Sequence, residues 1–279
     1  MRGFNPTSVG LPKPEASHQN VAHPSGWVSG AKVIMISVSI IGHNEEKNIE
    51  RCLESVKWAD EIIVVDSGST DKTVEIAVRF GAKVFENQWQ GYGAQKNFAI
   101  DKASNNWILS IDADEVVTDE LKEEIRGIIK NSAGYAAFKI PRMLYFQGRL
   151  MKWSGADYQI RLFLKGRAKF DLEPVHEKLL VDGDIGKFKN SIIHYSYENL
   201  TDYFNRFNRY TSLDARKRYQ KGARFNLWHC ILPFHKFISM YFLKLGFLDG
   251  RQGLDWAVLC AFYDIVKFMK LRELQNEKK

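Results

Sequence analysis

The stretch WILSIDAD, residues 107–114, decides the fold that this 279-residue sequence predicts. It begins with a short and mostly apolar run, typical of a strand buried inside a sheet, and it ends in two aspartates one residue apart. Three earlier runs have the same apolar character, and they predict further strands over Val33–Ile41, Glu61–Val65 and Lys83–Phe85.

Helical patterns separate these four strands. Apolar residues recur at helical spacing in Glu46–Lys57, Lys72–Phe80 and Gly93–Ala103. Strands and helices that alternate at this spacing need right-handed crossovers, so we predict an α/β fold with a mostly parallel sheet flanked by helices.

The pattern changes after about residue 132. Tyr135–Ile140, Tyr158–Leu164 and Val175–Val181 favour strands without helices between them, which predicts an antiparallel extension of the sheet. From residue 200 onward the sequence is helical and rich in aromatic residues. We therefore expect a leader over 1–31, an α/β domain over 32–199 that divides between 132 and 133, and a helical arm over 200–279.

The composition of residues 1–31 and the number and spacing of the cysteines suggest the cellular compartment of the protein. Residues 1–31 hold four of the seven prolines and lack the apolar segment of a signal peptide, which favours a flexible leader. The three cysteines, Cys52, Cys230 and Cys260, have no close spacing. This argues against a disulfide framework or a zinc cluster, and a reducing cytoplasmic setting is the simplest interpretation.

Positive charge is confined to the arm. The chain carries 40 Lys and Arg against 33 Asp and Glu, a formal net charge of +7. Residues 200–279 hold 15 of these basic residues and 7 of the acidic ones, so the first 199 residues are close to neutral. A nucleic-acid enzyme would more often be basic around its cleft, and no nucleic-acid signature accompanies the arm, so we expect no nucleic-acid partner.

Polar and mostly acidic motifs follow three of the predicted parallel strands, at Gly42–Glu46, Asp66–Asp71 and Asp112–Asp114. Ligands bind at the carboxyl ends of the strands in an open parallel sheet. A single motif of this kind can be a helix cap, and Asp71 fits a cap as well as a ligand role. Three motifs at one edge of a sheet favour a binding site.

Asp112 and Asp114 repel each other unless a cation or a proton lies between them. Mg²⁺ takes one or two carboxylates from a protein and leaves its other positions to phosphates and water. The pair therefore suits a site for a divalent metal and a diphosphate. An acidic turn that caps a helix over Thr118–Lys130 is the alternative, and the strand context alone leaves both open.

Four segments, in this order and spacing, resemble the nucleotide-sugar half of family 2 glycosyltransferases, which have the GT-A fold. They are ISVSIIGHNEEKNIERCLESV (36–56), DEIIVVDSGSTDKT (60–73), GYGAQKNFAI (91–100) and WILSIDADE (107–115). The continuation resembles the lipopolysaccharide core subgroup of WaaE (KdtX) type, in DYQIRLF (157–163), PVHE (174–177), HYSYENL (194–200), NRYTSLDARK (208–217) and GFLDG (246–250).

The resemblance implies roles for residues on the donor side. Asn44 and Glu45 would lie beside the nucleoside, and Asp66 would contact the base or ribose. Lys96 and Asn97 match a basic and polar pair near the diphosphate.

The same resemblance implies a divalent cation, Mg²⁺ or Mn²⁺. Asp112 and Asp114 match the DxD motif, in which the metal bridges the two phosphates, and Asp114 would be the more direct ligand. His176 could complete the metal shell, since imidazole accepts Mn²⁺ more readily than Mg²⁺, although a lone histidine is more often a structural hydrogen-bonding group.

Transfer with inversion needs a carboxylate that takes the proton of the acceptor hydroxyl. Asp157 falls where the family has its acceptor-side acid, although this sequence lacks the common Glu-Asp pair there, and Glu177 is the alternative. Arg161 could face the diphosphate or pair with Asp157, and the sequence does not separate these two possibilities.

The arm combines basic residues with aromatic stripes, but no stretch reaches the roughly 18 uncharged apolar residues of a spanning helix. Such helices can lie in the interface of an anionic membrane, and their cations can meet acceptor phosphates. Alternatively, the aromatic residues simply pack against the catalytic domain.

The sequence therefore predicts an inverting, metal-dependent hexosyltransferase. The resemblance implies transfer from UDP-glucose to a lipopolysaccharide core or related glycolipid, at the cytoplasmic face of the inner membrane. The alternatives are a polyprenyl phosphate or protein acceptor, nucleotidyl transfer, and a non-catalytic membrane-binding module.

Overall fold

The first part of the chain alternates strands and helices as predicted. A computed structural model describes residues 35–130, 134–173, 177–197 and 199–277; the predicted leader (1–31) and His176 lie outside them. The elements are β1 (Ile36–Gly42), α1 (Ile49–Val56), β2 (Glu61–Asp66), α2 (Thr73–Arg79), β3 (Lys83–Glu86), α3 (Tyr92–Lys102) and β4 (Trp107–Asp112).

These four strands form a parallel sheet in the order β3-β2-β1-β4. The register pairs Gly42 with Asp66 and Ile41 with Asp112. The three polar motifs therefore lie at one edge of the sheet, because parallel strands in this register end together. The expected α/β fold of GT-A type is confirmed.

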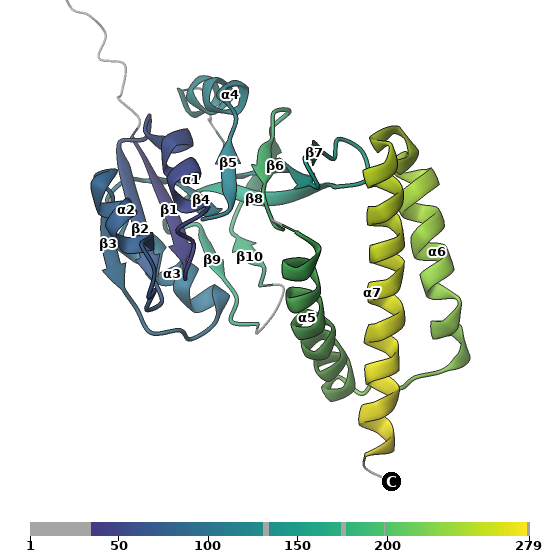
Figure 1. Ribbon diagram of the computed structural model, residues 1–279. Helices are drawn as coiled ribbons and strands as arrows, with labels where there is room; N and C mark the ends of the chain where they lie inside the picture. The colour runs from purple at the N-terminus through teal and green to yellow at the C-terminus, as the bar shows by residue number, and fades with distance from the viewer. Residues whose placement is uncertain (1–34, 131–133, 174–176, 198, 278–279) are drawn as a thin grey trace, which may run out of the picture. The chain divides into compact units, whose positions relative to one another are not determined.

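Helices cover both faces of this sheet (Figure 1). Because alternate strand residues point to opposite faces, Ile40 and Leu109 pack with α1 and α2, whereas Ile63 and Ile108 pack with α3. All four side chains are fully buried. The near-continuous apolar character of the strands follows from this burial on both faces.

The sheet continues beyond β4 as a mixed extension, in the order β4-β8-β6-β12-β5. Its elements are β5 (Glu115–Val117), α4 (Asp119–Lys130), β6 (Tyr135–Phe146), β7 (Arg149–Leu150), β8 (Ala156–Leu164), β11 (Asp184–Lys187) and β12 (Ile192–His194). β8 runs antiparallel to both β4 and β6, as predicted. The short strands β5 and β12 were not predicted; three residues are too few to show a period.

A separate two-stranded ladder joins β9 (Ala168–Phe170) to β10 (Leu179–Val181). The strand predicted over Val175–Val181 is therefore shorter than expected within the described residues. Its first two residues lie outside them.

The arm is helical, as predicted, and begins at residue 200. It comprises α5 (Leu200–Gln220), η1 (Leu227–Cys230), α6 (Leu232–Ile238), η2 (Ser239–Leu243), η3 (Gly246–Asp249) and α7 (Arg251–Asn276). α7 contacts α5 on one side and α6 on the other (Figure 1). Among the described residues, no helix combines the length and the apolar character needed to cross a membrane.

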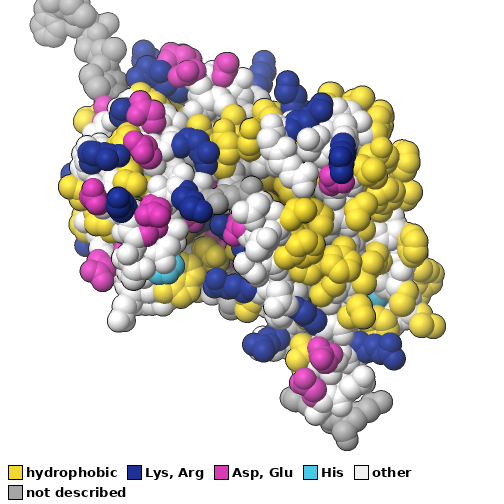
Figure 2. Space-filling view, in the orientation of Figure 1, with side chains coloured by type: hydrophobic (Ala, Val, Ile, Leu, Met, Phe, Trp, Pro, Cys, Tyr) yellow, Lys and Arg dark blue, Asp and Glu magenta, His cyan; other side chains and the backbone are white. Residues whose placement is uncertain are grey.

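Aromatic residues of α5 belong to the interior. Tyr203 and Phe207 are buried, and the ring of Phe207 stacks on Phe262 of α7 with centroids 5.4 Å apart. The stacking of Phe207 is thus made within the arm and not against the catalytic domain, and Phe204 of the same helix stays 43% exposed. Figure 2 shows that other hydrophobic side chains of the arm gather at the surface, over the region of α6 and α7.

Asp249, in the GFLDG segment, ties the arm to the loop between β7 and β8. Its buried carboxylate accepts the backbone N–H groups of residues 152–154 at 2.8–3.3 Å. The glycines around it allow close packing, since a Cβ on Gly253 would lie 1.9 Å from the carbonyl oxygen of Gly246. The motif therefore has a structural function that its sequence alone did not reveal.

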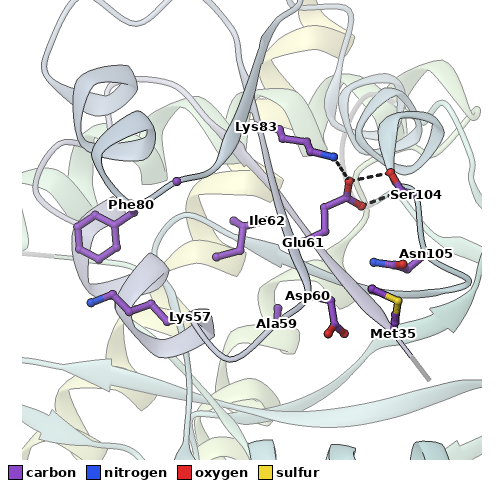
Figure 3. A pocket seen from close by; sticks show the side chains of 11 residues that line it. Met35, Lys57, Ala59, Asp60, Glu61, Ile62, Phe80, Lys83, Ser104 and Asn105 are labelled. Atoms are coloured by element: carbon purple, nitrogen blue, oxygen red, sulfur yellow. Dashed lines mark hydrogen bonds and ion pairs between the residues drawn. The ribbon is translucent and has the colours of Figure 1, made fainter. Parts of the chain in front are cut away.

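A cavity of about 400 Å³ lies at the opposite, amino-terminal edge of the parallel strands (Figure 3). Its lining includes Glu61, the first residue of β2, whose nearly buried carboxylate accepts hydrogen bonds from Lys83 Nζ (2.7 Å), Ser104 Oγ (2.8 Å) and Ser37 Oγ (2.5 Å). Burial would raise the pKa of Glu61, but these hydrogen bonds lower it to about 2. Glu61 thereby connects β1, β2, β3 and the loop before β4.

We expect Glu61→Gln to lower the free energy of unfolding by about 2–3 kcal/mol at neutral pH. The folded-state pKa lies below the ordinary value, so this contribution is present above about pH 4.5 and is lost as the pH falls toward about 2. Urea unfolding over this range should show the difference between variant and wild type shrinking as the pH falls. Glu54→Gln, at an exposed acid of α1, is the control, and an equal loss at all pH values would contradict the prediction.

Candidate active site

Asp112, at the carboxyl end of β4, is held by two cations from different elements. Lys96 Nζ of α3 lies 3.2 Å from one carboxylate oxygen, and Arg161 Nη2 of β8 lies 2.7 Å from the other. Burial would raise the pKa of Asp112, but the facing Arg161 and Lys96 hold it well below its usual range. Asp112 is therefore a carboxylate whose two oxygens are both engaged by the protein.

These contacts belong to a chain of seven charged side chains that alternate in sign. Each contacts the next, in the order Glu177, Lys96, Asp112, Arg161, Glu115, Arg142, Asp157. Glu115 is fully buried and also accepts the backbone N–H of Asp112 at 3.0 Å. Buried charges persist only when they are paired. The seven alternating side chains provide this pairing at the carboxyl edge of the sheet.

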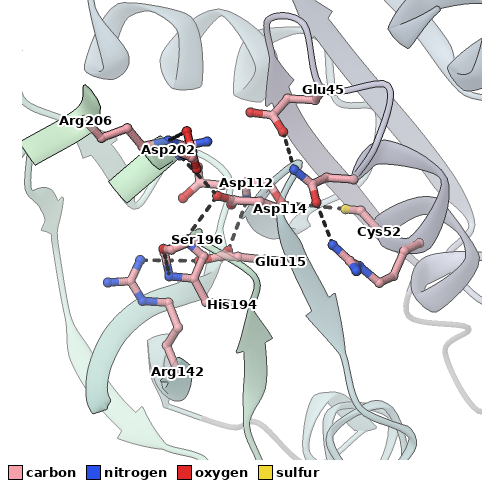
Figure 4. Close-up of polar contacts among 12 residues, drawn as sticks. Glu45, Cys52, Asp112, Asp114, Glu115, Arg142, His194, Ser196, Asp202 and Arg206 are labelled. Carbon is pink, nitrogen blue, oxygen red and sulfur yellow. Dashed lines mark hydrogen bonds and ion pairs between the residues drawn. The ribbon is translucent and has the colours of Figure 1, made fainter. Parts of the chain in front are cut away.

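Asp114 has different neighbours from Asp112 (Figure 4). Its carboxylate lies 3.3 Å from His194 Nε2 and 3.9 Å from Arg206 Nη1, which comes from the first turns of α5. Burial would raise the pKa of Asp114 and lower that of His194, but the attraction between the two groups shifts both pKa values the other way.

The short strands β5 and β12 explain how His194 reaches Asp114. They pair antiparallel with His194 opposite Glu115, and the backbone N–H of Tyr195 donates to the carbonyl of Asp114 at 2.8 Å. Sequence reasoning missed His194, Glu115 and Arg142 as site residues. The available signals were a histidine that ends a short β-branched run, and a third acid directly after Asp112 and Asp114.

The loops after β1 and β2 hold the expected nucleoside residues. Asn44 has a left-handed backbone (φ 56°), and its side-chain oxygen accepts the N–H of Thr70 at 2.8 Å. Asp66 is buried and accepts N–H groups of Gly68 and Ser69, both at 2.8 Å, so its visible contacts shape its own loop. The predicted contacts of these residues with a nucleoside stay predictions.

Glu45 lies nearer the metal motif. Its backbone N–H donates to Thr73 Oγ1 at 2.7 Å, and its carboxylate accepts Asn48 Nδ2 at 2.8 Å. Burial raises the pKa of Glu45, and the negative charge of Asp114 adds to this effect. Glu45 thus places a second acidic group close to Asp114.

Lys96 and Asn97 point to different surroundings although they are neighbours on α3. Lys96 contacts Asp112 and Glu177, at the strand edge where a diphosphate is expected. Asn97 uses both ends of its amide on the backbone of Phe170 in β9, with two hydrogen bonds of 2.9 Å. These contacts give Asn97 a structural role, and a role beside a diphosphate stays a prediction.

The two candidate bases stand at opposite ends of the charged chain. Asp157 does not pair with Arg161; its partner is Arg142, which is its neighbour across the β6–β8 ladder and donates to both carboxylate oxygens. Arg161 lies four residues further along β8, and its guanidinium contacts Asp112 and Glu115 instead. Burial would raise the pKa of Asp157, but Arg142 lowers it. Glu177 instead contacts Lys96 at 2.8 Å.

The residues at the strand edge fit a divalent cation that is shared with a diphosphate. Asp114 and His194 offer one oxygen and one nitrogen ligand side by side, which suits Mn²⁺ and, through the carboxylate, Mg²⁺. Within the part of the chain that the structure describes, no three His, Cys, Asp or Glu side chains form a metal cluster by themselves. A metal here would need phosphate oxygens to complete its coordination.

Comparison of the sequence with known proteins indicates the same family as the resemblance of its motifs. A sequence model described as Glycosyl transferase family 2 matches residues 37–176. An uncharacterised glycosyltransferase of Rickettsia typhi is 35% identical over 86% of this chain and 87% of its own length. The lipopolysaccharide core biosynthesis glycosyltransferase LpsC of Rhizobium meliloti is 28% identical over 81% of this chain and 90% of its own length.

Among solved structures, glucosyl-3-phosphoglycerate synthase from Mycobacterium tuberculosis aligns with a TM-score of 0.36 and 26% identity, over 44% of this chain and 50% of that chain. The assignment rests on the sequence matches, which span the parallel sheet and its acidic edge and, for the relatives, most of the chain. The chain therefore belongs to glycosyltransferase family 2.

Proposed function

We propose that this enzyme transfers a hexose from a nucleotide-sugar, UDP-glucose by its resemblance, to a lipopolysaccharide core or a related glycolipid, with inversion at the anomeric carbon. The observation that carries the proposal is the Asp114–His194 pair beside Asp112, at the carboxyl edge of the parallel sheet. The acceptor class is supported by the relative from Rhizobium meliloti, whose name assigns it to lipopolysaccharide core biosynthesis.

Lys96 and Arg161 would stabilise the departing nucleoside diphosphate. Both are almost fully buried, and their acidic partners fix them before the donor binds. Fixed charges in a site that excludes water stabilise developing negative charge without reorganisation. The pairing with Asp112 does not cancel this function, since each cation carries several N–H donors.

A divalent cation, when bound, supplies further positive charge at the diphosphate oxygens. Asp114 and His194 are the side chains that would hold it. Asp112, whose two oxygens already contact Lys96 and Arg161, would contribute through its remaining lone pairs.

Asp157 is our proposed base for the acceptor hydroxyl, with Glu177 as the alternative. Glu177 contacts the same lysine that contacts Asp112, and it therefore belongs to the diphosphate side. Asp157 lies at the other end of the charged chain, on the antiparallel extension. Inversion requires attack from the face opposite the leaving group, which favours the carboxylate that is farther from the diphosphate.

A glycolipid acceptor would place this reaction at a membrane surface. We accordingly propose peripheral association with the cytoplasmic face of the inner membrane, in which the basic arm faces anionic lipid.

Asp114→Ala should reduce metal-dependent sugar transfer by roughly 10²-fold or more, because the metal loses its carboxylate ligand. The measurement is donor turnover with added Mn²⁺, together with thermal unfolding to confirm that the variant is folded. Asp119→Ala, at an acid of α4 whose side chain is 94% exposed, is the matched control. Full activity in Asp114→Ala would remove the metal site from the proposal.

His194→Asn should raise the Mn²⁺ concentration needed for half-maximal activity by about tenfold or more, and the Mg²⁺ concentration by less, since imidazole favours Mn²⁺. Metal titrations of initial rates test this, with His235→Asn on α6 as the control. Equal shifts for both metals would indicate a purely structural role for His194.

At saturating donor, Asp157→Asn should lower kcat by about 10²-fold or more. Glu177→Gln should mainly raise the KM for the donor, because it frees Lys96 from its partner. Steady-state kinetics of both variants separate the two bases, and the opposite ranking in kcat would make Glu177 the base.

A further inference from the structure

Residues 227–248, which connect α5 to α7, carry the most exposed large apolar side chains of the arm. Leu227 is 82% exposed, Trp228 and Phe234 are each 74% exposed, and Leu243 is 72% exposed. More than half of the large hydrophobic side chains that the described structure leaves exposed come from residues 227–269. Figure 2 shows hydrophobic side chains gathered at the surface over the region of α6 and α7. Surfaces of this kind mark sites that bind a partner or a membrane.

The exposed charges around this surface are mostly positive. Arg224, Lys244 and Arg251 are exposed in the same part of the chain. Between residues 224 and 271 the acids are Asp249, which is buried, and Asp255 and Asp264, which are half-buried; Asp255 lies 3.9 Å from Arg251. Asp249 is fully used by the loop at 152–154, and Asp264 contacts Lys267 at 2.5 Å.

We propose that this surface, made by the apolar side chains of residues 227–248 and their flanking cations and called here the hairpin face, binds the interface of an anionic bilayer. The inference deepens the proposed function, because it names the surface by which the enzyme would reach a glycolipid acceptor. Aromatic and aliphatic side chains enter the boundary between headgroups and acyl chains, while Lys and Arg remain at the anionic headgroups.

A second copy of the chain fits the hairpin face less well. In a symmetric dimer the same patch meets itself, so the exposed cations Arg224 and Lys244 of both copies would approach one another, while the nearby acid Asp255 already faces Arg251. Like charges that face each other oppose association. Anionic headgroups provide the missing negative charge.

The hairpin face is attached firmly to the catalytic part. Asp249 ties η3 to the loop before β8, and α5, which packs along α7, carries Arg206 to within 3.9 Å of Asp114. Binding of the hairpin face to a bilayer would thus fix the orientation of the active site relative to the lipid surface.

The test is sedimentation of the full-length protein with vesicles of phosphatidylethanolamine and phosphatidylglycerol in equal parts, without donor or acceptor. We expect binding at low salt and much weaker binding to pure phosphatidylcholine. In about 1 M salt, where the Debye length is ~3 Å, the anionic preference should disappear. Phe234→Ser combined with Leu243→Ser should weaken binding at least about tenfold, since two large apolar side chains are lost.

The matched control is Val78→Ser combined with Ile185→Ser, which removes exposed apolar side chains of α2 and β11 and should leave binding unchanged. A second variant, Lys244→Glu with Arg251→Glu, should lose the preference for anionic vesicles while the protein stays folded. Light scattering checks the oligomeric state of every variant.

Two results would overturn the inference: absence of vesicle binding by the wild type, or a solution dimer that Phe234→Ser with Leu243→Ser dissociates. Turnover of the donor with a water-soluble acceptor should be the same in all these variants. This turnover separates the two proposals. If only the proposal on membrane binding is wrong, the wild type and all variants still turn over the donor. If the proposed function is wrong, the wild type shows no turnover either.

Discussion

The contact of Arg161 with the half-buried Asp112 and the fully buried Glu115 is the interaction on which the site depends. Three of the four residues from 112 to 115 are acidic, and they lie at the end of a strand whose remaining residues are buried. Such a segment is stable only if cations from elsewhere reach it. They come from α3, β6, β8 and α5, so the parallel sheet, its extension and the arm must all be in place before the acidic edge is compensated.

The cations that neutralise this acidic segment give the two aspartates of the motif different partners. Asp112 contacts cations through both oxygens and helps to fix them near the expected diphosphate, whereas Asp114 faces an imidazole and a distant guanidinium. The same chain of contacts gives the two candidate bases different electrostatic surroundings. One charged network thereby connects Glu177, at the expected diphosphate side, to Asp157, at the proposed acceptor side.

The parallel sheet and the strand-edge acids could be predicted from the sequence, because buried strands and amphipathic helices have distinct local patterns. The partners of those acids could not. Arg142 meets Asp157 only through the β6–β8 register, and His194 meets Asp114 only because two three-residue strands pair across nearly 80 residues of chain. Long-range register leaves no trace in local periodicity. For the arm, the helices and the positive charge could be predicted, but not which apolar side chains remain exposed to solvent. Phe207 and Phe234 belong to similar aromatic segments, yet Phe207 is buried and Phe234 is exposed.

Asp249 has a mechanical consequence. Its carboxylate is the acceptor for three consecutive backbone N–H groups immediately before the strand that carries Asp157 and Arg161. A tilt of the arm at this point would break these hydrogen bonds, and the buried N–H of Ser154 would lose its acceptor, which is costly. A displacement of the arm is therefore transmitted to the start of β8, because the arm and this strand are joined by these hydrogen bonds and do not move independently there. Any partner that holds the arm also holds the start of the strand that carries Asp157 and Arg161.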